Sequence, residues 1–154
     1  MAHKARKRFG QNFLVDQQVI NQIVSTIAPK RMDSIIEIGP GKGALTFPLI
    51  DHLDHIHVIE IDRDLISLLQ KKSNKKITIH ESDALVFNFD QFTKNIRIVG
   101  NLPYNISSPL LFHLLNHRNN IIDMTFMLQK EVVDRIVAPP GSKVYGRTSV
   151  IMQA

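Results

Sequence analysis

A loop with three glycines, Gly39-Pro40-Gly41-Lys42-Gly43, follows a short apolar run and precedes a stretch with helical spacing. Because glycine has no Cβ, a ligand can lie against the bare backbone of such a loop at the amino end of a helix. Glu60 lies in the next apolar run, 21 residues after Gly39, where a carboxylate can accept hydrogen bonds from both hydroxyls of a ribose. This pattern predicts a site for a nucleoside-containing cofactor, with an ordinary tight turn as the alternative. The spacing G-x-G-x-G differs from the G-x-G-x-x-G of dinucleotide sites, but alone it does not separate NAD from S-adenosylmethionine.

Asp83 follows the third apolar run of the sequence. Its carboxylate could accept a hydrogen bond from the exocyclic amine of an adenine, and a turn cap is the alternative. Because ligands of parallel sheets bind outside the carboxyl ends of the strands, we expect Asp83 at the same edge as Glu60.

The segment Asn101-Leu102-Pro103-Tyr104 follows the fourth apolar run and carries groups suited to methylating an aromatic amine. The lone pair of such an amine is delocalised, and a carboxamide oxygen and a main-chain carbonyl that accept its two N–H bonds favour a more nucleophilic nitrogen. Pro103 restricts the backbone and can direct the carbonyl of Leu102 inward, while Tyr104 offers a flat face on which an extruded base can stack. A sulfonium is already an activated leaving group, and the proton of the amine can leave after the transfer, so no acid–base residue is needed. A strand-to-helix turn rich in Asn and Pro is the alternative.

The elements that must position these residues alternate between two hydrophobic periods. Short apolar runs predict strands at Ser34–Ile38, Ile56–Ile61, Ile77–His80, Ile96–Gly100, Ile122–Leu128 and Ser149–Met152. Helical spacing lies between them, in residues 20–27 behind Asp16 as N-cap, Ala44–Leu53, Leu65–Lys72 opened by Asp62 or Asp64, Leu110–Leu115 behind Ser108 as N-cap, and Glu131–Val137. Strands that alternate with helices predict an α/β fold with a doubly wound, mostly parallel sheet.

The composition of the 154 residues, 44% hydrophobic and 21% charged, is that of one globular domain. No apolar run approaches the roughly 20 residues of a membrane span, and no signal peptide is recognisable. The absence of cysteine fits a reducing cytoplasm, where we expect the protein. Four cations, Lys4, Arg6, Lys7 and Arg8, precede the first acid and predict a polyanionic partner such as nucleic acid, with a solvated terminus as the alternative.

Two other groups of residues give weaker signals. The pairs His55 with His57 and His113 with His117 have a spacing that could bind metal, but no third ligand is evident, so no metal site is expected. A lysine cluster, Lys71, Lys72, Lys75 and Lys76, follows a predicted helix. It is more typical of a solvated turn than of a contact with RNA phosphates.

The sequence resembles the class I S-adenosylmethionine-dependent methyltransferases, and within them the ribosomal RNA adenine N6-dimethyltransferases. The resemblance runs almost end to end, through residues 8–14 (RFGQNFL), 37–43 (EIGPGKG), 101–107 (NLPYNIS), 129–132 (QKEV) and 145–147 (YGR). The leucine of Asn-Leu-Pro-Tyr, the Arg-Phe-Gly segment and the Tyr-Gly-Arg segment are more similar to the branch that modifies small-subunit (16S) rRNA.

The resemblance implies a role for each matching residue. Cofactor binding would fall to Asn12 and Leu14 from the N-terminal segment, to Gly39 and Gly41 near the methionine part, to Glu60 at the ribose, and to Asp83 and Ala84 at the adenine. Asn101 would lie between the cofactor methyl group and the target amine, and Leu102, Pro103 and Tyr104 would complete the base pocket. The roles of Asn12 and Leu14 rest on the resemblance alone.

The implied function is dimethylation of two adjacent adenines of 16S rRNA, in a small ribosomal subunit or its precursor. The alternatives are a large-subunit (23S) rRNA adenine methyltransferase of the macrolide-resistance type and a non-catalytic RNA-binding factor of ribosome assembly. Family members continue into a final strand and a helical RNA-binding domain. Residues 1–154, with a basic arm at 1–15, are therefore expected to be a catalytic domain truncated before that strand and that domain. Residues 124–128 are then expected at a sheet edge.

Overall fold

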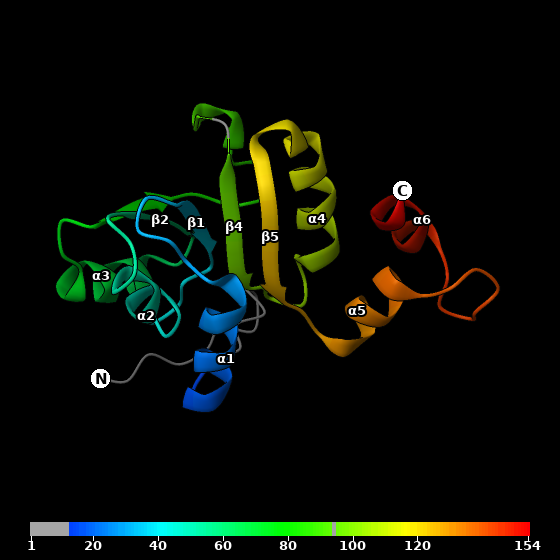
Figure 1. Cartoon of the computed structure of the whole chain (residues 1–154), viewed down its shortest axis with the longest axis horizontal. Helices are drawn as coiled ribbons and strands as arrows, with labels where there is room; N and C mark the ends of the chain where they lie inside the picture. Colours follow the sequence, from blue (N-terminus) through cyan, green and yellow to red (C-terminus); the bar gives the residue numbers. More distant parts are fainter. Residues whose placement is uncertain (1–12, 94) are drawn as a thin grey trace.

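The computed structural model describes residues 13–93 and 95–154, which fold around a five-stranded sheet (Figure 1). The strand order is β3-β2-β1-β4-β5, and every neighbouring pair is parallel. The strands are β1 Ser34–Ile38, β2 Ile56–Glu60, β3 Ile77–Glu81, β4 Ile96–Asn101 and β5 Ile121–Met127. These strands confirm the first five apolar runs to within one residue at either end. They also confirm the α/β class and the edge position of β5.

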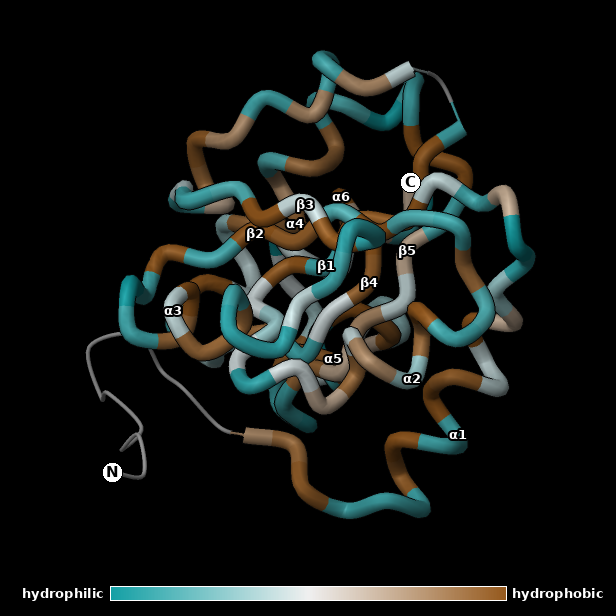
Figure 2. The backbone as a smooth tube through the Cα atoms, turned by 90° about the vertical axis from the view of Figure 1, so that its left-hand side faces the viewer, coloured by the Kyte–Doolittle hydropathy of each residue, from teal (hydrophilic) through white to brown (hydrophobic). Residues whose placement is uncertain are grey.

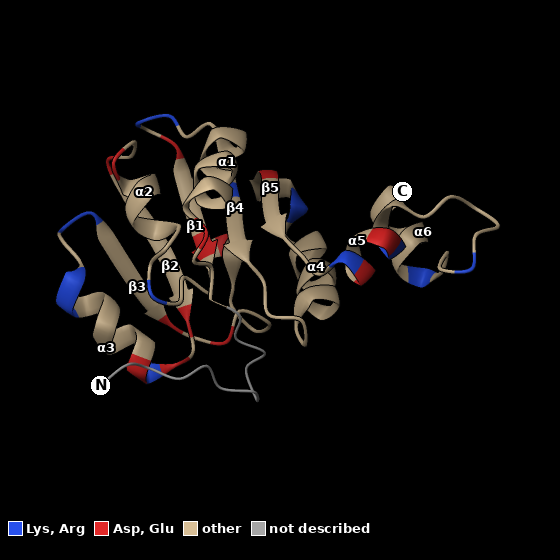
Figure 3. Ribbon diagram, turned by 90° about the horizontal axis from the view of Figure 1, so that it is seen from below, with Lys and Arg blue, Asp and Glu red and all other residues tan. Residues whose placement is uncertain are grey.

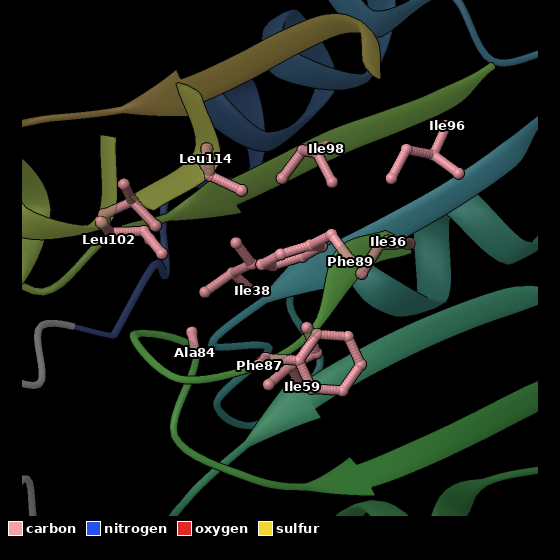
Figure 4. Close-up of a cluster of buried hydrophobic side chains, with 11 residues drawn as sticks. Ile36, Ile38, Ile59, Ala84, Phe87, Phe89, Ile96, Ile98, Leu102 and Leu114 are labelled. Atoms are coloured by element: carbon pink, nitrogen blue, oxygen red, sulfur yellow. The ribbon is translucent and has the colours of Figure 1, made fainter. Parts of the chain in front are cut away.

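Helices cover both faces of this sheet, as a doubly wound fold requires. They are α1 Gln17–Ile27, α2 Thr46–Ile50, α3 Arg63–Lys72, α4 Ser107–Asn116, α5 Lys130–Val137 and α6 Arg147–Gln153. Residues of α1 and α2 form one core cluster with β1 and β2, and α1 alternates between hydrophobic and hydrophilic stretches along its length (Figure 2). On the other face, α4 and the segment after β3 pack on the sheet through Phe87, Phe89 and Leu114 (Figure 4).

Two helix starts confirm the sequence prediction, and one corrects it. Asp16 caps α1, because its side chain accepts hydrogen bonds from Gln18 N and Val19 N. Asp62, rather than Asp64, caps α3. The prediction that Ser108 caps the fourth helix was wrong, since α4 already begins at Ser107, with Ile106 at the cap position. Proline is tolerated at the third position of α4 because the first N–H groups of a helix have no partner within it.

The prediction of a strand at Ser149–Met152 was wrong, because these residues lie in α6. Ser149 is buried and Val150 exposed, and Ser149 Oγ donates to the carbonyl oxygen of Arg135 in α5. Gln153 Nε2 also donates to the carbonyl oxygens of Ile136 and Ala138, at 2.6 and 2.9 Å. A four-residue apolar run fits a strand or one buried turn of a helix, and here packing on α5 selects the helix.

The two last helices extend away from the sheet (Figure 1). They contact each other, and they follow β5 through the segment after Met127. None of the helices in residues 13–93 and 95–154 has the length and apolar character that crossing a bilayer requires.

Candidate functional site

A cavity of about 290 Å³ lies where the strands β1, β2 and β4 end. Predicted residues from four separate segments line it: Gly39, Gly41, Glu60, Asp83, Ala84, Asn101 and Pro103. The parallel strands place these segments at one edge, which confirms that the glycine loop, Glu60 and Asp83 lie together.

The glycine loop needs its glycines for backbone reasons. Gly39 and Gly41 have φ angles of 66° and 58°, which residues with a Cβ rarely adopt. The Gly39 N–H donates to the carbonyl oxygen of Ile59 at 2.9 Å, so the loop is tied to β2 as well as to β1. A Cβ on Gly41 would lie 3.3 Å from the ring of Phe13, which also lines the cavity. The loop therefore presents bare backbone to whatever occupies the cavity.

Glu60, the last residue of β2, is buried and held by backbone donors. Its Oε1 accepts the N–H groups of Ile61 and Asp62, both at 3.0 Å, and its Oε2 accepts the Gly41 N–H at 3.3 Å. Burial raises the pKa of Glu60, and the three hydrogen bonds oppose this rise. A carboxylate fixed in this way is an oriented acceptor for hydroxyl groups in the cavity.

The segment after β3 supplies the residues predicted for an adenine. Asp83 Oδ1 accepts the Leu85 N–H at 2.9 Å, so Asp83 caps a turn in addition to lining the cavity. Within the described chain, its second carboxylate oxygen has no hydrogen bond. Ala84 is buried, and Ser82 N donates to the carbonyl oxygen of Glu60 at 3.0 Å. The two alternatives for Asp83, turn cap and ligand acceptor, are therefore compatible.

The segment Asn101–Tyr104 leaves β4 beside the cavity. Asn101 and Pro103 line the cavity, whereas the Leu102 side chain is 5% exposed and packs in the core cluster of Figure 4. Leu102 N donates to the carbonyl oxygen of Met127 at 3.1 Å. The carbonyl of Leu102 accepts no hydrogen bond from residues 13–93 or 95–154. It is thus an available acceptor between two residues that line the cavity.

Tyr104 lies outside the set of residues that line the cavity. It is 51% exposed and sits in the turn that leads into α4. That turn is fixed at Pro103, whose carbonyl oxygen accepts from Ser107 Oγ at 2.9 Å and from Ile106 N at 3.3 Å. An exposed ring on a fixed turn near the cavity can be reached by a large substrate.

Of the N-terminal residues predicted for the cofactor, Asn12 lies outside the described residues. Leu14 lines a smaller cavity of about 170 Å³, which shares Phe13 and Asn101 with the first one. Leu14 is therefore near the site but not on its main cavity.

Glu37, in β1 just before the glycine loop, is a buried acid of the same smaller cavity. Thr46 Oγ1 donates to its Oε2 at 2.5 Å. Burial raises the pKa of Glu37 from 4.5 to about 7, and the nearby charge of Glu60 adds to this rise. A carboxyl with this pKa changes its charge near neutral pH.

Sequence reasoning did not assign a role to several residues that line the main cavity: Phe13, Ile61, Leu65, Ser82, Asn105 and Ile106. Ile61 carried the clearest signal, because it is an apolar residue directly after the acid that ends a strand. It is 45% exposed, so it offers an apolar face to the cavity beside Glu60.

The histidine pairs lie elsewhere. His57 Nδ1 and His80 Nε2 are 3.0 Å apart on β2 and β3, and His55 Nε2 is 2.7 Å from Thr78 Oγ1. His113 Nε2 is 2.8 Å from the carbonyl oxygen of Phe87. Within the described ranges no three metal-ligating side chains gather at one point. His57 packs on Phe92, and His80 and His113 contact Phe87, so these three imidazoles hold the segment after β3. His55 instead contacts β3 itself.

Comparison with known proteins identifies the family of this chain. The profile of the ribosomal RNA adenine dimethylase family matches residues 2–154. The chain is 59% identical, over 152 residues, to a ribosomal RNA small subunit methyltransferase A of Dechloromonas aromatica. It is 57% identical, over 154 residues, to the protein of that name from Methylobacillus flagellatus. These matches cover 98% and 99% of this chain, and the chain spans about 60% of the length of these curated relatives.

Two solved structures resemble the fold. A dimethyladenosine transferase from Plasmodium falciparum has a TM-score of 0.79 and 31% identity, covering 90% of this chain and 51% of that one. The 23S rRNA methyltransferase ErmE has a TM-score of 0.73 and 30% identity, covering 92% and 55%. The fold is thus that of the class I S-adenosylmethionine-dependent methyltransferases. With the family profile matching nearly every residue, the chain belongs to the ribosomal RNA adenine dimethylase family.

Proposed function

We propose that this chain forms the cofactor-binding and catalytic part of an enzyme that dimethylates adenine N6 in small-subunit (16S) ribosomal RNA, with S-adenosylmethionine as methyl donor. One observation carries the proposal. Asn101 and Pro103 line the cavity that Glu60 and Asp83 also line, and the Leu102 carbonyl between them is an unbonded acceptor. Two acceptors for an amine thus lie beside a site suited to a nucleoside.

The residues of the cavity fit S-adenosylmethionine. The Gly39–Gly41 backbone leaves space for the methionine part, Glu60 would accept the two ribose hydroxyls, and the free oxygen of Asp83 would accept the adenine amine. Ile61 offers an apolar surface for the adenine ring. When bound, the sulfonium supplies an activated methyl group.

The chain's own contribution to the reaction is the orientation of the target amine. The side-chain oxygen of Asn101 and the Leu102 carbonyl would accept its two N–H bonds and hold the nitrogen lone pair toward the methyl group. Tyr104 would stack on the extruded base, an interaction worth about 1–3 kcal/mol. Holding the reacting atoms in line accounts for the rate enhancement without a tuned acid or base.

The relatives from Dechloromonas and Methylobacillus support the small-subunit substrate, since both are named as small-subunit methyltransferases and share 57–59% identity with this chain. Two adjacent adenines, modified in an assembling small subunit or its precursor, are the proposed target. A cytoplasmic location, which the absence of cysteine fits, is part of the same proposal. The likeness to ErmE supports a 23S rRNA target as the second candidate.

Transfer of labelled methyl groups from S-adenosylmethionine separates these candidates. Unmethylated small subunits, unmethylated large subunits and naked rRNA are incubated in parallel with the protein. The proposal expects label in small-subunit adenines as N6,N6-dimethyladenosine. Label confined to large subunits would support the second candidate, and binding of rRNA without any transfer would support a non-catalytic role.

A further inference from the structure

Four lysines gather at the amino ends of β2 and β3, opposite the edge that carries the cavity. This lysine cluster consists of Lys71 and Lys72 at the end of α3 and Lys75 and Lys76 just before β3, where Figure 3 shows Lys and Arg segments in blue. All four side chains are exposed. The cluster is fixed to the sheet. The backbone of Lys76 accepts the Ile56 N–H at 2.8 Å, and Lys76 Nζ donates to the carbonyl oxygen of Leu53 at 3.2 Å.

The charges of the cluster are not neutralised by the protein. Within residues 13–93 and 95–154, none of the four lysines forms an ion pair. The nearest segment, residues 51–55, holds Asp54, which is paired with Arg31 at 2.7 Å, and the exposed Asp51. Lys30, on the loop before β1, is a further exposed cation, and its charge offsets that of Asp51. The local balance is therefore strongly positive.

A groove of about 820 Å³ borders the cluster. It lies between α1 and α2 and reaches the loop that carries Asn74. Amide and hydroxyl side chains of Asn21, Ser25 and Asn74 line it, together with His52 and Asp51. The other half of the lining is apolar, from Val24, Ala28, Pro29, Phe47, Pro48 and Ile50, so only the polar side of the groove suits a phosphate backbone. That side reaches the unpaired lysines at Asn74.

Helix α3 connects the edge that carries the cavity with the lysine cluster at the opposite edge of the sheet. Helix α3 begins at Arg63, three residues after Glu60, and ends at Lys72, so its ten residues span about 15 Å. Double-stranded DNA carries one phosphate charge per about 1.7 Å of its axis, with both strands counted, so a duplex of this length carries on the order of ten phosphates. One structured RNA can thus contact both places.

We propose that the lysine cluster and the polar side of the bordering groove are a second RNA contact, which binds the phosphate backbone of the substrate at the far end of α3, about 15 Å from the start of that helix. This inference rests on the proposed function for the identity of the RNA. The cluster would bind the phosphates of structured RNA independently of the RNA sequence. Neither an acidic protein nor an anionic membrane is the proposed partner.

The test compares two triple variants with equal loss of charge. Lys71→Gln, Lys72→Gln and Lys75→Gln together remove three of the four lysines of the cluster and spare Lys76, whose Nζ donates to Leu53. Arg118→Gln, Arg135→Gln and Lys143→Gln remove three exposed cations elsewhere. Binding of an RNA hairpin of about 20 base pairs is measured by fluorescence anisotropy across a range of salt concentrations. The cluster variant is expected to raise the Kd about tenfold at ~0.1 M salt and to reduce the slope of log K against log salt by about 2–3. The control variant should stay near wild type.

Each other result has a defined meaning. Equal effects of both variants, an unchanged salt slope or no binding of the hairpin would overturn the inference, as would binding of phosphatidylserine vesicles with no binding of RNA. S-adenosylmethionine affinity and melting temperature of the cluster variant should match wild type, because its substitutions are remote from the cavity. If RNA binding depends on the cluster but no methyl transfer occurs, the proposed function fails and the inference stands. If methyl transfer occurs and RNA binding does not depend on the cluster, the inference fails and the proposed function stands.

Discussion

Gly41 and Glu60 are joined by a hydrogen bond of 3.3 Å, from the glycine N–H to the Oε2 of the carboxylate. The bond links the loop after β1 to the end of β2, two segments that both line the cavity. Glu60 therefore fixes the shape of the glycine loop as well as offering acceptors to a ribose.

Replacing Glu60 by Gln should weaken S-adenosylmethionine binding by about 1.5–3 kcal/mol, the range for hydrogen bonds to a charged group. Isothermal titration calorimetry measures this directly. Glu81→Gln, at the end of the neighbouring strand β3 and on the exposed surface, is the matched control and should bind normally. Tight binding of NAD with no S-adenosylmethionine signal would contradict the assignment of the cavity.

Tyr104→Ala should lower the rate of RNA methylation by about 5- to 150-fold, from the loss of about 1–3 kcal/mol of base stacking. Its affinity for S-adenosylmethionine should be nearly unchanged, because Tyr104 does not line the cavity and is 51% exposed. Single-turnover methylation and calorimetry separate the two quantities, with Tyr145→Ala as control. Equal losses in cofactor affinity and rate would show that Tyr104 serves the cofactor instead of the base.

Glu37 should make stability fall as the pH rises from 4.5 to about 7. Burial raises its folded pKa from 4.5 to about 7, so the folded chain keeps a proton that the unfolded chain releases in this range. The favourable contribution is complete below pH 4.5 and is lost as the pH approaches 7. Over that interval the wild type should lose about 3 kcal/mol of unfolding free energy relative to Glu37→Gln.

Urea unfolding of both proteins at several pH values checks this difference. Glutamine keeps an oxygen that can accept from Thr46 Oγ1, so the variant should fold. Glu131→Gln, exposed on α5, should follow the wild type. A constant difference between wild type and Glu37→Gln at every pH would mean that the buried carboxyl does not titrate in this range.

His57 should make stability fall as the pH is lowered from 6.5 toward 4. Burial, together with the charges of His55 and His80, lowers the pKa of His57 from 6.5 to about 4. The fold thus favours the neutral imidazole, and this contribution is present above pH 6.5 and is lost as the pH falls toward 4. His57→Gln should flatten the loss of stability between these values, measured by urea midpoints. The exposed His52→Gln should not, and identical acid profiles for all three proteins would refute the assignment.

The fold was predictable where sequence pattern and packing agree. Apolar runs such as Ile96–Gly100 are bounded by polar turns, so their strand character is set locally. Ser149–Met152 was mispredicted because its state depends on contacts with Arg135 and Ile136, which a short apolar run does not reveal. Secondary structure of such a run is decided by its partner.

The site was predictable for residues at strand ends. Glu60, Asp83 and Asn101 come together because parallel strands bring their carboxyl ends to one edge. Phe13 approaches Gly41 from a segment far away in the sequence, and no local pattern reports that contact. The same limit applies to Leu14, whose smaller cavity exists only because the chain before α1 lies against the glycine loop.

A crystal structure of the protein with S-adenosylhomocysteine would show whether the cavity is the cofactor site, because that product keeps the nucleoside and the amino acid part of the cofactor. We expect the ribose hydroxyls on Glu60, the adenine against Ile61 with its amine on the free oxygen of Asp83, and the sulfur facing Asn101. Density for the ligand outside the cavity, or a ribose that does not contact Glu60, would contradict it.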